Sequence, residues 1–202
     1  MIGAVVLAAG QSRRMGQPKL CLPWGKTTIL GQVIETLAKT GLDEIVVVTG
    51  AARHEVEAAI AEQIRQFPIR VVHNPAYEQT EMLGSIQTGL RALSDRVEAA
   101  LIVLGDQPQV QERTVKLVLV AYQNHQAGLV IPSYNQRRGH PWLAARHLWP
   151  SLLALTPAQT PRDFLQAHAA QILYVPVEDD SILKDVDTPE AYASEKPQKE
   201  HS

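Results

Sequence analysis

Short runs of apolar residues alternate with helical patterns along most of this chain. The runs are rich in Val, Ile and Leu and show no alternation of polar and apolar positions. Such runs are typical of strands that are covered on both faces in a mainly parallel sheet. We therefore predict strands at six places: Ile2–Ala8, Glu44–Thr49, Ile69–His73, Ala99–Leu104, Leu129–Pro132 and Ile172–Val175.

Four helical segments lie between these runs, each with its apolar residues on one face. The first begins after Thr27 or Thr28, either of which can act as the N-cap, and it ends before Gly41. The apolar faces of the four segments consist of Leu30, Val33, Ile34, Leu37 and Ala38; Val56, Ala59, Ile60 and Ile64; Ile86, Leu90 and Leu93; and Val115, Val118, Leu119 and Tyr122.

The alternation of strands and helices predicts the fold class. It favours right-handed crossovers and a three-layer α/β/α sandwich around a mainly parallel, doubly wound sheet of the Rossmann-like type. Segment Ser133–Trp142 is polar, contains Gly and Pro and interrupts the alternation, so we expect a small antiparallel insertion there. In such folds, ligands bind at the carboxyl ends of the strands.

Composition limits the classes of protein to which the chain can belong. Its 202 residues are 45% hydrophobic, enough for a single domain, which we expect over residues 1–193; the polar residues 194–202 predict a disordered tail. A net charge of −2 argues against a nucleic-acid partner, and a single cysteine excludes an internal disulfide. No apolar run approaches the ~20 residues that span a bilayer, so we expect no membrane partner and a cytoplasmic location.

The loop after the first predicted strand has the residues of a phosphate site. Ala8, Ala9 and Gly10 are small enough to let a ligand approach the backbone amides, while Arg14 and Lys19 can place positive charge on a polyphosphate. The glycine spacing matches neither a Walker A loop nor G-x-G-x-x-G. A tight turn with solvated arginines is the alternative interpretation.

Acidic residues follow two of the predicted strands. Asp106 comes directly after Ala99–Leu104, and Asp185 and Asp187 follow the last strand. Magnesium commonly takes one or two carboxylates, with substrate phosphates and waters completing its shell. Asp106 with one of the later pair is therefore a candidate magnesium site, although Asp187 or Thr188 can equally serve as the N-cap of a short helix.

Two further stretches have residues suited to binding. Met82–Ser85 leads into a helix whose N-terminus can present amides and the Ser85 hydroxyl to a nucleotide, or can be an ordinary capping segment. Arg137–Pro141 is a basic turn that can receive an anionic acceptor, or can be a solvated loop.

Taken in order, six sequence motifs resemble the MobA-like nucleotidyltransferase family over nearly the whole chain. The resemblance is strongest to molybdenum cofactor cytidylyltransferases. Its most specific part matches the pattern L-x-A-G-x-S-x-R-M-G-x-x-K. The motifs are LAAGQSRRMGQPKL, NPAY, MLGS, LGDQP, RGHP and DVDTPEAY.

The resemblance implies a function for individual residues. Arg14, Lys19 and Asp106 would be catalytic. The nucleotide would be held by Leu7, Ala8, Ala9, Gly10, Arg14, Lys19, Ser85 and Asp106. Mg²⁺ would be bound by Asp106 and Asp187. The acceptor pocket would be bordered by Arg138, Gly139, His140 and Arg162.

The resemblance also implies a reaction: transfer of CMP from CTP to the phosphate of molybdenum-molybdopterin, with release of pyrophosphate. A recipient molybdoenzyme is a candidate protein partner. Ala9-Gly10 and Pro18 favour cytidine over guanine. The chain departs from the family at Glu81, where a glycine is usual, and at Ala158–Arg162, where only Arg162 is kept.

Three alternatives remain open. The nucleotide can be GTP or another triphosphate, and the acceptor can be a sugar phosphate or alcohol phosphate. The chain can also be a nucleotide-binding module without turnover. Two features disfavour a dinucleotide-dependent oxidoreductase. The glycine spacing does not match, and Gly50-Ala51-Ala52 follows the second strand, where such enzymes have an acidic residue that binds the ribose.

Overall fold

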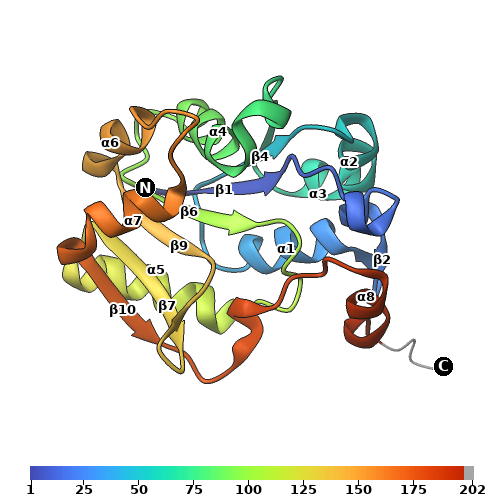
Figure 1. Ribbon diagram of the computed structural model, residues 1–202. Helices are drawn as coiled ribbons and strands as arrows, with labels where there is room; N and C mark the ends of the chain where they lie inside the picture. The colour runs from blue at the N-terminus through green and yellow to red at the C-terminus, as the bar shows by residue number, and fades with distance from the viewer. Residues whose placement is uncertain (198–202) are drawn as a thin grey trace.

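The computed structural model describes residues 1–197. Its main sheet has the strand order β10-β7-β9-β6-β1-β4-β5, and a short strand, β8, pairs with β7 (Figure 1). The strands are β1 (Ile2–Ala8), β4 (Glu44–Thr49), β5 (Ile69–His73), β6 (Ala99–Leu104), β7 (Leu129–Tyr134), β8 (Arg137–Arg138), β9 (Trp142–Ala145) and β10 (Ile172–Pro176). All six predicted strands are present, and the main sheet is mainly parallel as expected.

The antiparallel insertion is also present. Strand β9 lies between β6 and β7 and runs antiparallel to both, while β8 forms a hairpin with β7. A separate two-stranded sheet consists of β2 (Pro23–Trp24) and β3 (Thr27–Thr28).

Helices cover both faces of the main sheet, which gives the predicted three-layer sandwich (Figure 1). One face packs against α1 (Ile29–Ala38), α2 (Arg53–Ala59), α3 (Ala61–Gln66) and α5 (Glu112–His125). The other face packs against α4 (Tyr77–Ala92), α6 (Trp149–Leu153) and α7 (Pro161–Ala167). Successive residues of β1 point to opposite layers, because Ala4 and Val6 belong to one buried cluster and Val5 to the other.

Several short elements complete the chain. Helix α8 (Pro189–Glu195) lies near β2 at the right of Figure 1, on the side toward which the arrowheads of β1 and β6 point. None of the described helices is long and apolar enough to cross a membrane. Short 3₁₀ helices occupy Arg13–Met15, Lys19–Cys21, Arg146–Leu148, Ala169–Gln171 and Asp180–Leu183.

The prediction of a single continuous second helix is wrong. The apolar face from Val56 to Ile64 belongs to two helices, α2 and α3, which are separated at Ile60. The Ile60 backbone leaves helical values, with φ −115° and ψ 15°, while its side chain is fully buried. The break allows Gln63 to donate hydrogen bonds to Thr27 and Glu35, so tertiary contacts outweigh helix continuity here.

The first two residues of the predicted tail lie in a helix. Ser194 and Glu195 belong to α8, which ends at Glu195. The Thr188 side chain caps the start of this helix, Pro189 occupies its first turn, and the Lys196 N–H closes its end on the Tyr192 carbonyl. The rest of the expected tail, residues 198–202, lies outside the described residues.

Candidate functional site

A cavity of about 460 Å³ opens at the carboxyl ends of β1 and β6. One wall consists of Leu7, residues 9–14, Lys19 and Leu20, and the facing residues come from the first turns of α4. Leu104, Asp106 and Asp187 complete the lining. This is the edge of the sheet at which the sequence places its candidate ligand site.

Lys19 joins the two predicted metal ligands. Its Nζ contacts Asp106 Oδ2 and Asp187 Oδ1, although these residues belong to three distant segments of the chain. Only 12% of the Lys19 side chain is exposed, against 21% for Asp106 and 28% for Asp187. Arg14 adds a second cation, because its Nη2 lies 2.5 Å from Asp187 Oδ2.

The charges of this cluster reinforce one another. Burial lowers the pKa of Lys19, but the nearby carboxylates of Asp106 and Asp187 outweigh it and leave this pKa above its ordinary value. Burial raises the pKa of Asp187, but Lys19 and Arg14 together hold it below its ordinary value. Lys19 and Asp187 are therefore ionised at neutral pH.

Local structure determines which of the two later aspartates reaches Lys19. Thr188 is the N-cap of α8, and its hydroxyl accepts a hydrogen bond from Ala191 N. Asp187 therefore does not cap this helix. Asp185 instead accepts a 2.7 Å hydrogen bond from Gln107 Nε2. Burial and, after it, the charge of Asp106 raise the pKa of Asp185. Asp187 and Asp106 thus lie together around one cation, the Lys19 ammonium, whereas Asp185 contacts Gln107.

The donor set fits magnesium. Two carboxylates converge on a single cation, the Lys19 ammonium, and Mg²⁺ prefers hard oxygen ligands of this kind. Within residues 1–197, no group of three or more His, Cys, Asp or Glu side chains is arranged to hold a metal ion. Phosphate oxygens and waters would therefore have to complete the shell of an ion bound by Asp106 and Asp187.

The backbone is tightly packed where β1 ends. A Cβ atom on Gly50 would lie 2.5 Å from the Ala9 carbonyl oxygen, and one on Gly105 would lie 2.8 Å from the Leu7 carbonyl oxygen. Beyond this point, the loop turns through left-handed positions at Ser12 and Gly16. The Ser12 hydroxyl accepts a hydrogen bond from the Lys19 N–H, which closes the loop and directs it toward the cavity.

Helix α4 contributes a wall with an irregular backbone. Glu81 has φ 48° and ψ −138°, and regular helix resumes after it. Ser85 is buried below this kink; its hydroxyl donates to the Glu81 carbonyl and accepts from Asn74 Nδ2 at 3.2 Å in each case. Ser85 lines the cavity, as the sequence predicts.

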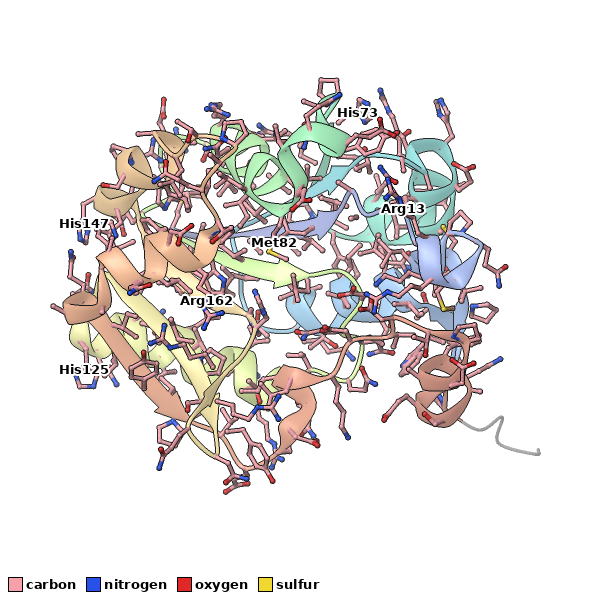
Figure 2. The ribbon with its side chains drawn as sticks, viewed as in Figure 1. Arg13, His73, Met82, His125, His147 and Arg162 are labelled. Atoms are coloured by element: carbon pink, nitrogen blue, oxygen red, sulfur yellow. The ribbon has the colours of Figure 1, made fainter. Side chains whose placement is uncertain are left out.

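Most predicted nucleotide-site residues line the cavity, whereas the predicted acceptor residues are not part of its lining. Leu7, Ala9 and Gly10 line the cavity with Arg14, Lys19, Ser85 and Asp106, whereas Ala8 is buried and does not. Arg138, Gly139, His140 and Arg162 are also absent from its lining. Arg138 lies over the Tyr174 ring, 5.4 Å from its centroid. Figure 2 shows Arg162 well apart from Arg13, with Met82 between them in this view.

Some lining residues were missed by the sequence analysis. Gln11 donates a 3.3 Å hydrogen bond to Glu78, which ties the loop after β1 to α4, and Arg13 donates to Gln11. No local pattern marks the Gln11–Glu78 contact, because 67 residues separate its partners. The sequence did mark Glu81 as unusual, because this residue replaces the glycine that the resemblance to the family leads us to expect.

Comparisons with known proteins agree with this geometry. Residues 4–172 match the model of the MobA-like NTP transferase domain. The chain is 30% identical to the molybdenum cofactor cytidylyltransferase of Escherichia coli K12, over 96% of this chain and 95% of that protein. It is 29% identical to the nicotine blue oxidoreductase of Paenarthrobacter nicotinovorans, over 94% and 93% respectively.

A solved structure has the same fold. The crystal structure of Rv0371c from Mycobacterium tuberculosis H37Rv superposes with a TM-score of 0.80 and 28% identity, covering 96% of each chain. A complex of that protein with manganese has a TM-score of 0.77 and 26% identity, again over 96% of each chain. The domain match, the fold and the relatives lead to one conclusion: this chain belongs to the MobA-like NTP transferase family and is a nucleotidyltransferase of that family.

Proposed function

We propose that the protein is a magnesium-dependent cytidylyltransferase that transfers CMP from CTP to the phosphate of molybdenum-molybdopterin. The observation that carries the proposal is the convergence of Asp106 and Asp187 on Lys19 inside the cavity. The similarity to a molybdenum cofactor cytidylyltransferase over nearly the full length of both chains supports the choice of substrates. We expect the reaction in the cytoplasm, with a molybdoenzyme receiving the product.

The reaction is an in-line displacement at phosphorus. An oxygen of the acceptor phosphate forms a bond to the α-phosphorus of CTP, while the bond from that phosphorus to the bridging oxygen breaks. Pyrophosphate leaves with the electron pair. Because the acceptor phosphate is already ionised at neutral pH, the protein needs no strong general base, and positioning and charge neutralisation supply most of the catalysis.

The cationic wall of the cavity would hold the triphosphate. Arg14 can approach it from the loop, since its side chain is 70% exposed, and the flexible stem of Lys19 lets its ammonium turn from the carboxylates to the phosphates. Both charges then stabilise the leaving pyrophosphate. Asp106 and Asp187 would hold Mg²⁺, which when bound neutralises charge that develops on the α-phosphate.

The test is magnesium-dependent pyrophosphate release with CTP, GTP and ATP in parallel, each with and without molybdenum-loaded molybdopterin. Release from CTP alone, and only with the acceptor, is the expected result. Release from GTP would identify GTP, rather than CTP, as the nucleotide substrate. Release only with sugar or alcohol phosphates would identify one of these as the acceptor. CTP binding without release from any combination would favour the non-catalytic module.

Asp106→Ala tests the metal ligand directly. Loss of one of two carboxylates should lower turnover by about a hundredfold or more while the protein stays folded, because Asp106 lies in the loop after β6 and outside the core. Asp95→Ala is the matched control, since the Asp95 side chain is fully exposed and pairs with Arg146 away from the cavity. Unchanged turnover in Asp106→Ala would exclude the metal role.

The relative named as an oxidoreductase defines a further control. The loop after β1 offers basic residues rather than the G-x-G-x-x-G pattern, and the cavity also contains the carboxylates of Asp106 and Asp187. We therefore expect no oxidation of NADH or NADPH by this protein under conditions that support pyrophosphate release. Steady oxidation of either cofactor with a quinone acceptor would contradict the transferase proposal.

A further inference from the structure

Glu81 combines a backbone that suits glycine with a place in the lining of the cavity. Its φ of 48° and ψ of −138° lie outside the regions that residues with a Cβ ordinarily adopt. Such outliers persist only where the surroundings determine the backbone. A glycine would satisfy the backbone without strain, so the presence of a glutamate points to a use for its carboxylate.

The neighbours of Glu81 hold its backbone in place. Its carbonyl accepts from the Ser85 hydroxyl, and Asn74 Nδ2 binds both Ser85 and Thr80. Thr80 in turn packs against Gly84, where an added Cβ would lie 1.9 Å from the Thr80 hydroxyl oxygen. None of these contacts involves the Glu81 carboxylate.

The Glu81 carboxylate is available to a ligand. Within residues 1–197, it has no hydrogen bond and no ion pair, and Glu81 is both exposed and part of the cavity lining. The other carboxylate on this wall differs, because Glu78 accepts a hydrogen bond from Gln11. Tyr77 and Met82 lie beside them and give the wall apolar surface suited to a flat ring.

The two walls divide a nucleotide between them. The triphosphate belongs with Arg14 and Lys19, since these are cations beside the carboxylate pair. The nucleobase then faces the wall formed by α4. A carboxylate only accepts hydrogen bonds, so it attracts an exocyclic amino group and repels a carbonyl oxygen at the same ring position.

We propose that Glu81 determines nucleobase specificity by accepting a hydrogen bond from an exocyclic amino group, so that the site selects CTP over UTP. This inference rests on the proposed function, because it assumes that the cavity binds a nucleoside triphosphate. Cytosine carries the amino group at the position where uracil carries a carbonyl oxygen, so the two pyrimidines differ at the atom that Glu81 would read.

Equilibrium binding of CTP and UTP tests the proposal without turnover. Calorimetric titrations with Mg²⁺ and no acceptor should show a preference for CTP of about tenfold to a hundredfold, as for a hydrogen bond to a charged group. Glu81→Gly keeps the backbone conformation and should bring the ratio close to one by weakening CTP. Glu81→Gln retains an acceptor but adds a donor for the uracil oxygen, so UTP should gain relative to CTP.

Glu62→Gln is the matched control, because that exposed carboxylate accepts a hydrogen bond from Gln66 and does not line the cavity, and it should keep the native preference. An unchanged ratio in Glu81→Gly, or an equal loss for both nucleotides, would overturn the specificity proposal. Selective CTP binding without pyrophosphate release would overturn the proposed function and support Glu81. Binding of neither nucleotide by the native protein would overturn both.

Discussion

His140 is a partly buried base whose pKa lies far below its ordinary value. Burial lowers its pKa from 6.5 to about 4, and its backbone N–H donates a 3.2 Å hydrogen bond to the Ile182 carbonyl. The neighbouring Gly139 packs closely on Ile182, since an added Cβ would lie 2.5 Å from the Ile182 oxygen. His140 is therefore neutral in the folded protein at pH 7 and its main-chain contacts are structural, while its role at the acceptor pocket stays a prediction.

The burial of His140 predicts acid sensitivity. In the unfolded chain the imidazole binds a proton below about pH 6.5, whereas the folded chain resists this until the pKa of about 4. Stability is complete above pH 6.5 and falls as the pH decreases toward 4, by up to about 3 kcal/mol. Urea unfolding at pH 7 and pH 5 should show this loss in the native protein and not in His140→Gln. The exposed His54→Gln variant should keep the native pH dependence.

Asp187 reaches the site because a whole segment is attached to the end of β6. Gln107 Nε2 donates to Asp185 Oδ1 at 2.7 Å, and Val186 N donates to the Asp106 carbonyl at 3.0 Å. These contacts connect the chain before α8 to the loop that carries Asp106. Gln107 is therefore a positioning residue: it holds the segment that carries Asp187, rather than contacting a ligand itself.

Gln107→Leu should loosen this attachment. It removes the hydrogen bond of the buried Gln107 amide to the Asp185 carboxylate, so the free energy of unfolding should fall by about 1 kcal/mol. The KM for CTP should rise, because Asp187 lies on the same segment, and Gln107→Glu should not rescue it next to Asp185. Gln111→Leu is the control, since that side chain is exposed and makes no capping hydrogen bond. A native KM in Gln107→Leu would contradict the positioning role.

At the scale of the whole molecule, the site is formed by three regions that are distant in the sequence. Lys19 lies 87 residues from Asp106 and 168 residues from Asp187, so a bound nucleotide and metal ion would hold distant segments together. A ligand that binds only the folded state stabilises it by about 2.7 kcal/mol at a hundredfold excess over its Kd.

This linkage predicts a thermal shift that depends on the metal. CTP with Mg²⁺ at that excess should raise the Tm by about 5–10 °C, judged from the usual dependence of Tm on free energy for chains of this size. Chelation of the metal with EDTA should remove most of the shift and should abolish pyrophosphate release. Asp187→Asn should behave as the native protein does in EDTA. An equal shift with and without metal would contradict the role of the carboxylate pair.

Much of the fold follows from local sequence. A run such as Ile2–Ala8 can be buried on both faces only as a central strand, and Thr28 and Thr188 cap helices because their side chains bind the first free amides. The break at Ile60 was not predicted, because the apolar spacing continues through it and only the contacts of Gln63 reveal it.

The sequence by itself determined the layers of the sandwich, the basic loop after β1 and the acidic residue after β6, because each depends on neighbours in the chain. Only the tertiary structure decided that β9 runs between β6 and β7, that Asp187 rather than Asp185 meets Lys19, and that Arg162 is not part of the cavity lining. Spacing along a chain determines which face of an element a residue occupies, whereas distances between remote residues depend on how the elements pack.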